Sequence, residues 1–176
     1  MYIVLGRFQP FHKGHAHLVE AALAKGNTTI AIGSSQAEPS MNNPWSAEER
    51  EEMIRAWLGD REANIVQIPD INDPPNWVSH ATKYHGEGIL VTSDEPTKSL
   101  YEQSDFQVEW VDLSNRESFE GWRVRATLKM LSTVYETEAQ KEVMSASIPT
   151  EVVGWLLDQD ALYRLYTMSR DLEHAG

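Results

Sequence analysis

The sequence predicts an α/β fold, with one domain over residues 1–176. We expect a parallel five-stranded sheet with helices on both faces and further helices at the C-terminal end. Short apolar runs alternate with segments whose apolar residues recur at helical spacing, which indicates a parallel sheet covered by helices. The 176 residues fit one domain, and no internal repeat, low-complexity segment or linker divides them.

The strands and helices follow one another along the chain. Strands are predicted at 2–5, 28–32, 65–68, 88–92 and 106–111. Helices are predicted after the turn at 6–14, after a capping box at 46–49, and at 76–84, 121–131 and 148–172, the last with a break near 158–160. A polar stretch at 33–45 is long enough for a functional loop.

The composition is that of a soluble globular protein, with 41% hydrophobic and 24% charged residues and no run as long as a membrane span. A net charge of -12 argues against non-specific binding to nucleic acid or anionic membranes. No signal-peptide pattern precedes the first strand, so we expect a cytoplasmic protein. The lack of cysteine excludes disulfides, zinc–thiolate sites and thiol catalysis.

One basic stretch, residues 6–15, stands out against this acidic composition. It contains four potential cations: Arg7, His12, Lys13 and His15. The stretch joins the first strand to the first helix, where free N–H groups form a site for anions. Gly6 and Gly14 let the backbone come close to a ligand. This pattern predicts a binding site for a small anion.

His12 and His15 share one face of a helix, because they lie three residues apart. Such a pair alone is also typical of a metal site or of two surface histidines. His15 falls on the stripe of Leu18 and Val19 that faces the sheet, and no nearby carboxylate or third histidine completes a metal site. Phosphate is therefore the better-fitting ligand. His17 is expected to face solvent.

Parallel sheets bind ligands outside the carboxyl ends of their strands, and the basic stretch is the first loop at that edge. The chain contains neither G-x-G-x-x-G after the first strand nor G-x-x-x-x-G-K-[ST]. These absences argue against a dinucleotide-binding dehydrogenase and against a P-loop NTPase.

Residues 6–15 resemble the G-R-F-Q-P-x-H-x-G-H signature of the nucleotidyltransferase superfamily, in particular of archaeal-type nicotinamide-nucleotide (NMN) adenylyltransferases. Residues 32–37, 43–50 and 148–153 resemble further motifs of these enzymes, and 68–77 resemble I-P-x-x-D-I-x-x-N-x-x-W with a shortened approach. The resemblance covers nearly the whole chain. It implies a Rossmann-like fold and attack by the NMN 5′-phosphate on the α-phosphorus of ATP, giving NAD and pyrophosphate.

The resemblance also implies roles for individual residues. The catalytic group would be Arg7, His12, His15, Arg50 and Arg125. ATP would be bound by Gly6, Phe8, Gln9, Pro10, Gly14, Gly121 and Val124. NMN would be bound by Ser34, Asp70, Asn72, Trp77 and Arg116. Mg²⁺ is expected on the ATP phosphates, held mainly by ATP and water, and the resemblance suggests a homo-oligomer.

Several of these residues have a purely structural alternative. Arg50 begins the apolar stripe of its helix and could pair with a neighbouring carboxylate. Trp77 offers a flat face to a pyridinium ring, and the alternative is that it is a core residue. Asp70 and Asn72 could bond the carboxamide or ribose, or could cap the helix at Trp77.

Two segments depart from the family pattern. Glu120 and Trp122 stand in place of serine and threonine, and Asp94 and Glu95 in place of glycine and asparagine. A carboxylate at 120 would repel a triphosphate unless Arg123, Arg125 or magnesium neutralised it. Another adenylyl- or cytidylyltransferase and a catalytically impaired nucleotide sensor therefore remain alternative functions.

Overall fold

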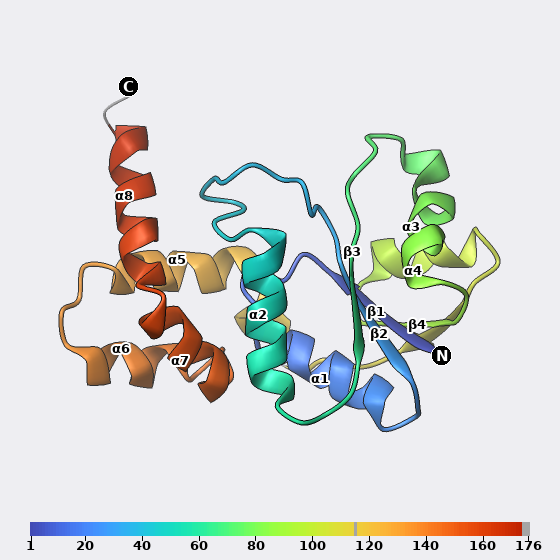
Figure 1. The fold of residues 1–176 in the computed structure, drawn as a ribbon, viewed down its shortest axis with the longest axis horizontal. Helices are drawn as coiled ribbons and strands as arrows, with labels where there is room; N and C mark the ends of the chain where they lie inside the picture. Colours follow the sequence, from blue (N-terminus) through green and yellow to red (C-terminus); the bar gives the residue numbers. More distant parts are fainter. Residues whose placement is uncertain (115, 174–176) are drawn as a thin grey trace. The chain divides into compact units, whose positions relative to one another are not determined.

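The structure is a computed structural model that describes residues 1–114 and 116–173, with side chains as far as Arg170. Its strands are β1 (Tyr2–Gly6), β2 (Thr28–Ile32), β3 (Asn64–Gln67), β4 (Ile89–Thr92) and β5 (Gln107–Trp110). Its α-helices are α1 (Lys13–Leu23), α2 (Ala47–Leu58), α3 (Trp77–His85), α4 (Glu95–Glu102), α5 (Gly121–Leu131), α6 (Thr137–Met144), α7 (Thr150–Asp158) and α8 (Ala161–Glu173). Two 3-10 turns lie at Pro74–Asn76 and Arg116–Phe119. The predicted α/β fold is confirmed (Figure 1).

The chain divides into two compact units. The first unit comprises Met1–Arg7, Gly14–Ala37 and Asp60–Ser114, and the second comprises Phe8–Lys13, Glu38–Gly59 and the described residues of 116–173. The basic stretch 6–15 thus contributes residues to both units. That the whole chain forms one domain stays a prediction.

The first unit is built on the sheet, whose strands are all parallel and lie in the order β3-β2-β1-β4-β5. From β1 the chain adds β2 and β3 on one side, then returns to place β4 and β5 on the other. The strand order therefore reverses beside β1, and the carboxyl ends of β1 and β4 form the switch point where such sheets bind ligands.

Helices cover both faces of this sheet (Figure 1). On one face Ile3 and Leu90 pack against Val78 of α3 and Tyr101 of α4. Side chains alternate along a strand, so the fully buried Val4 points to the opposite face, where α1 lies. The central strands β1 and β4 contain uninterrupted apolar runs, at 2–5 and 89–91, because helices cover both faces of the sheet there.

A buried polar pair joins α3 to α4. His85 Nδ1 donates to the carbonyl of Gly86 at 2.7 Å, so its Nε2 accepts from the Tyr101 hydroxyl at 2.9 Å. Burial lowers the pKa of His85 and raises the pKa of Tyr101. Both groups are therefore neutral at pH 7 and satisfy each other in the core.

The second unit consists of helices that pack on one another, α2 on α7, α7 on α8, and α5 on both α6 and α8. Its core contains Met53, Ile54, Val152 and Leu156, all fully buried. The predicted capping box of α2 is present, because Ser46 Oγ accepts from Glu49 N–H while the Glu49 carboxylate accepts from Ser46 N–H.

The element boundaries depart from the sequence prediction in a few places. The helix predicted at 76–84 begins as a 3-10 turn at Pro74 and continues as α3 to His85. Helices α4 and α6 were not predicted, because each has eight residues and buries only one of them, Tyr101 and Met144.

Candidate active site

The predicted site residues fall in both units and are described unit by unit. In the first unit, Arg7, His15 and Ser34 lie in the segments that follow β1 and β2. Arg7 comes directly after β1 and is exposed, while His15 is half-buried in the first turn of α1, next to the buried Gly14. Ser34 follows β2 with a φ of 49°, in the left-handed region that residues other than glycine seldom adopt. His17 is exposed, as predicted.

A pocket of about 380 Å³ lies beside the loop that follows β3. It is lined by Leu5, Asp70, Asn72, Asp73, Pro74, Trp77, Thr97 and Leu100. The structure thus brings together Asp70, Asn72 and Trp77, three of the five residues predicted to bind NMN. Ser34 is not among the described residues that line this pocket, and Arg116 belongs to the second unit.

Trp77 is partly buried and serves the core and the pocket at once. Its ring meets Tyr101 edge-on at a centroid distance of 6.4 Å, and its remaining surface lines the pocket. The proposed cap of this helix by Asp70 or Asn72 is wrong, since the N-cap of α3 is Asn76 and makes no side-chain capping bond. Asp70 and Asn72 are instead part of the pocket wall.

Gln36 is a positioning residue that sequence reasoning missed. Its Nε2 donates to the carbonyl of Asp70 at 3.2 Å, and its Oε1 accepts from the Asp70 N–H at 2.9 Å. The Gln36 side chain therefore fixes the loop after β3 by bonding to both the N–H and the carbonyl of Asp70. The sequence shows only that Gln36 is a polar residue in the long loop after β2. Its partner Asp70 could not be predicted, because it lies 34 residues away.

In the second unit, His12 is buried and its ring stacks on Phe119 at a centroid distance of 6.2 Å. Burial, assisted by the nearby charge of Arg125, lowers the pKa of His12 to about 4. Of the four potential cations in the basic stretch, His12 is therefore neutral at pH 7. Lys13 donates from Nζ to the carbonyl of Ser145 at 2.6 Å.

Arg125 lies buried on α5, and its Nη1 donates to the carbonyl of Gln9 at 3.0 Å. A Cβ on Gly121 would lie 3.1 Å from that Nη1, so the glycine leaves room for the guanidinium. Val124 is buried beside it. Gly121 therefore makes space for the Arg125 guanidinium, which the Gln9 carbonyl holds.

Residues 8–11 are tightly integrated into the second unit. Phe8 and Pro10 are buried, and the Phe11 ring lies 5.0 Å from that of Trp57. The Gln9 amide bonds to the Trp45 backbone twice, donating to its carbonyl at 2.8 Å and accepting from its N–H at 3.1 Å. These bonds fix the segment that joins β1 to α1.

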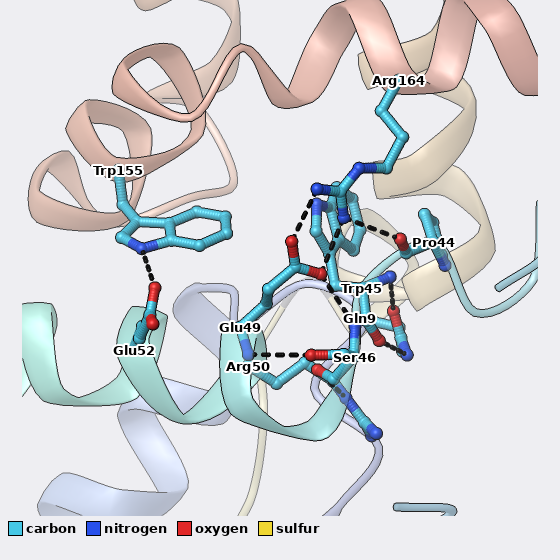
Figure 2. A network of polar contacts seen from close by, with 9 residues as sticks. All are labelled: Gln9, Pro44, Trp45, Ser46, Glu49, Arg50, Glu52, Trp155 and Arg164. Atoms are coloured by element: carbon cyan, nitrogen blue, oxygen red, sulfur yellow. Dashed lines mark hydrogen bonds and ion pairs between the residues drawn. The ribbon is translucent and has the colours of Figure 1, made fainter. Parts of the chain in front are cut away.

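Arg50 is almost fully buried, and its Nε donates to the carbonyl of Ser46 at 3.0 Å. Figure 2 shows this bond within a wider polar network, in which Arg164 grips Glu49 with two parallel hydrogen bonds. Sequence reasoning missed Arg164, which lies 115 residues from Glu49.

The two replaced positions at the start of α5 lie near the surface. Glu120 pairs with Arg123, whose Nε lies 2.9 Å from the Glu120 carboxylate. Trp122 is 58% exposed, and the Arg123 guanidinium lies 4.7 Å above its ring. Arg123 therefore neutralises the carboxylate. It is one of the three groups, with Arg125 and magnesium, that were expected to be able to do so.

The cytidylyltransferase-like family model matches residues 3–149 of the chain. A nicotinamide-nucleotide adenylyltransferase of Picrophilus torridus is 34% identical over 127 residues, covering 69% of this chain and 75% of the relative. The chain belongs to the cytidylyltransferase-like family. A second such relative, from Thermoplasma acidophilum, is 30% identical over 171 residues and covers 94% of this chain and 90% of its own.

Solved structures similar to this cytidylyltransferase-like protein include a bifunctional NMN adenylyltransferase/ADP ribose pyrophosphatase from Francisella tularensis. One structure has a TM-score of 0.63 and 27% identity, covering 73% of this chain and 42% of that one. Another, complexed with AMP and a manganese ion, has a TM-score of 0.70 and 21% identity, covering 98% and 52%. The chain spans about half the length of these structures. The predicted family, fold and nucleotidyltransferase class are confirmed.

Proposed function

We propose that this protein transfers AMP from ATP to NMN, giving NAD and pyrophosphate. The observation that carries the proposal is the pocket after β3, which Trp77 lines together with Asp70 and Asn72. A flat aromatic ring suits the electron-poor nicotinamide, and the polar side chains suit its carboxamide or ribose. Similarity to NMN adenylyltransferases over most of the chain supports the same reaction.

In the proposed reaction, an oxygen of the NMN 5′-phosphate attacks the α-phosphorus of ATP. The bond from that phosphorus to the bridging oxygen of the β-phosphate breaks, and pyrophosphate leaves with the electron pair. Such a transfer depends on positioning and on stabilising charge rather than on covalent chemistry by the protein. Arg7, Arg50 and Arg125 would supply permanent positive charge for phosphate oxygens.

The two histidines would act by hydrogen bonding and positioning. His12 is neutral at pH 7, so it would donate an N–H to a phosphate oxygen without adding a charge. His15 and the N–H groups at the start of α1 would bind the α-phosphate. The buried arginines are held by carbonyls of Ser46 and Gln9, so they are oriented before substrate arrives.

Magnesium would arrive with ATP. Among the described residues, no group of three or more His, Cys, Asp or Glu could hold a metal ion. We propose an ion held mainly by ATP phosphate oxygens and water, because Mg²⁺ keeps several waters and binds substrate phosphates. The related structure with AMP carries manganese, which supports the use of a divalent ion.

The substrates would be small molecules, since a net charge of -12 disfavours polyanionic partners. No helix within 1–114 or 116–173 is long and apolar enough to span a membrane. Cytoplasmic location and a homo-oligomer stay predictions.

One observation favours a second candidate, a transferase for another phosphate acceptor. Counted from Asp70, the asparagine of D-I-x-x-N-x-x-W falls on Pro74, which lacks an amide side chain. Pro74 lines the pocket, so recognition of the acceptor would change there. A screen of mononucleotides and sugar or pantetheine phosphates, read by pyrophosphate release, separates the two candidates.

The test of the proposed function combines purified protein with NMN, ATP and Mg²⁺ and measures NAD. We expect NAD from the wild type, strong loss in His15→Ala and little change in His17→Ala, a matched control on the exposed side of the same turn. Binding of ATP without any NAD formation would favour the nucleotide sensor instead.

A further inference from the structure

We propose that Arg164 is a positioning residue, which through Glu49 and Pro44 fixes the backbone that supports Gln9 and Arg50. The inference rests on the proposed function, because Gln9 and Arg50 are predicted to serve ATP. Every contact in it lies within the second unit. Figure 2 draws the residues from Arg164 to Gln9 and Arg50.

Arg164 projects from α8 and makes three hydrogen bonds. Its Nη1 and Nη2 donate to the two carboxylate oxygens of Glu49 at 2.7 and 2.6 Å, and Nη1 also donates to the carbonyl of Pro44 at 3.2 Å. A two-pronged pair fixes direction as well as distance. Burial acts to raise the pKa of Glu49, but hydrogen bonds from Arg164 and from Ser46 N–H outweigh it and lower the pKa.

Ser46 connects Glu49 to Arg50, because it is hydrogen-bonded to both residues. Glu49 Oε2 accepts from the Ser46 N–H at 2.8 Å, and Ser46 Oγ accepts from the Glu49 N–H at 3.2 Å. The carbonyl of the same serine accepts from Arg50 Nε at 3.0 Å. The buried guanidinium of Arg50 therefore bonds to a residue whose position Glu49 fixes.

Trp45 connects Pro44 to Gln9, because it follows Pro44 in the chain and is hydrogen-bonded to Gln9. The Gln9 amide makes its two buried bonds with the backbone of Trp45, the residue after Pro44. The carbonyl of Gln9 in turn accepts from Arg125. A shift of residues 44–46 would therefore disturb the segment 8–11 and, with it, the partner of a buried arginine.

The chain provides a matched control for this connection. Trp155 of α7 donates from Nε1 to Glu52 of the same helix α2 at 3.1 Å (Figure 2). That bond also joins α2 to a C-terminal helix, but it involves neither residues 44–46 nor Arg50. Loss of either connection should cost stability, whereas only loss of the Arg164 connection should disturb the site.

The experiment compares Arg164→Met with Trp155→Phe by hydrogen exchange, thermal unfolding and kinetics. In Arg164→Met we expect the Trp45 amide, which donates to Gln9, to exchange at least about tenfold faster. We also expect kcat/KM for ATP to fall roughly 10- to 100-fold, because small misplacements of binding groups are costly. Trp155→Phe should leave both within about twofold while lowering Tm.

Two further variants sharpen the comparison. Arg164→Lys keeps the positive charge but loses the two-pronged guanidinium. Its Trp45 exchange rate and its kcat/KM for ATP should therefore fall between those of wild type and Arg164→Met. Glu49→Gln retains the capping box, because glutamine also fits that position. The double variant E49Q/R164M should be no worse in kcat/KM than R164M alone, because both changes break one connection.

Equal effects of Arg164→Met and Trp155→Phe on Trp45 exchange and on kcat/KM would overturn the proposal and leave Arg164 a merely structural residue. If Arg164→Met does not fold, Arg164→Lys is judged against Trp155→Phe by the same criterion. Failure of the wild type to make NAD would refute the proposed function, while Trp45 exchange would still decide whether Arg164 positions the segment.

Discussion

The two units carry polar groups of very different kinds. In the first, the pocket after β3 presents Asp70, Asn72 and Asp73, which are half-buried or exposed, and none of its eight described lining residues is a cation. In the second, Arg50 and Arg125 are 1% and 8% exposed and bond to backbone carbonyls. The pocket of the first unit suits recognition of a neutral or cationic ring, and the buried arginines of the second unit suit fixed positive charge for phosphate.

This difference has a physical reason. A buried charge is costly unless it is hydrogen-bonded, so the second unit surrounds its arginines with carbonyls and a supporting network. The pocket carboxylates remain close to water and need less support. We therefore expect substitutions of these buried arginines to change both stability and rate, and substitutions in the pocket to change mainly substrate preference.

The largest effect is expected for Arg125→Lys. Lysine lacks the planar fork, so the Gln9 carbonyl would lose its partner and a phosphate oxygen its oriented donor. We expect kcat/KM to fall on the order of 100-fold and stability to fall by about 1–3 kcal/mol. Steady-state kinetics and urea unfolding measure the two, with Arg123→Lys as the exposed control on the same helix. A purely structural arginine would change stability and leave the rate of the folded protein intact.

His12→Gln should change how stability depends on pH. Burial holds the pKa of His12 at about 4, below that of the unfolded chain at 6.5. The unfolded chain therefore binds a proton first as pH falls, so this part of the stability is complete above pH 6.5 and is lost toward pH 4. The loss in wild type is at most about 3 kcal/mol.

Urea unfolding at pH 7 and pH 4.5 measures this dependence. The decrease should be smaller in His12→Gln and unchanged in the exposed control His17→Gln. Identical pH profiles for wild type and His12→Gln would contradict a buried neutral imidazole.

Trp77→Ala should weaken acceptor binding in the first unit. Loss of the ring removes the stacking surface of the pocket, so KM for NMN should rise roughly tenfold, equivalent to about 1.4 kcal/mol, while KM for ATP changes little. Trp110→Ala, on β5 and 42% exposed, is the control. Equal increases in both KM values would show that Trp77 acts only as a core residue.

Asp73→Asn should reduce discrimination between NMN and nicotinate mononucleotide. Asp70 and Asp73 both line the pocket, and under the proposed function their carboxylates would repel the acid form and accept from the amide. We expect the ratio of kcat/KM values, NMN over nicotinate mononucleotide, to fall about three- to tenfold, since one partly exposed charge contributes about 1 kcal/mol. Asp112→Asn is the control, and an unchanged ratio would remove the electrostatic explanation.

Glu120→Ser should have the smallest effect. Its carboxylate is neutralised by Arg123 near the surface, and exposed pairs contribute little. We expect kcat/KM for ATP to change by less than about threefold and stability by about 0.5 kcal/mol or less. A large gain in ATP affinity, measured by calorimetry, would show that the carboxylate opposes the triphosphate after all.

Much of the fold could be predicted because local patterns decide it. The run of mainly β-branched residues at 28–32 predicted β2 with its observed ends, and helix α5 has the predicted bounds. Helices α4 and α6 could not be predicted in the same way, because most of their residues stay in water.

In the site, too, the features set by local sequence could be predicted, and those set by distant contacts could not. The segments that contribute Asp70, Asn72 and Trp77 were predictable because they follow a strand end and lie close in sequence. The bonds of Gln36 to Asp70 and of Arg164 to Glu49 were not, because they join segments 34 and 115 residues apart. The neutral state of His12 was also hidden, since it depends on burial and on the charge of Arg125.

The most direct measurement follows isotope from ATP through a single turnover with NMN and Mg²⁺. Label in the α-phosphate should appear in NAD, and label in the γ-phosphate should appear in pyrophosphate, both at the same rate. Labelled α-phosphate recovered as ADP or unreacted ATP, with no labelled NAD, would contradict the proposed transfer.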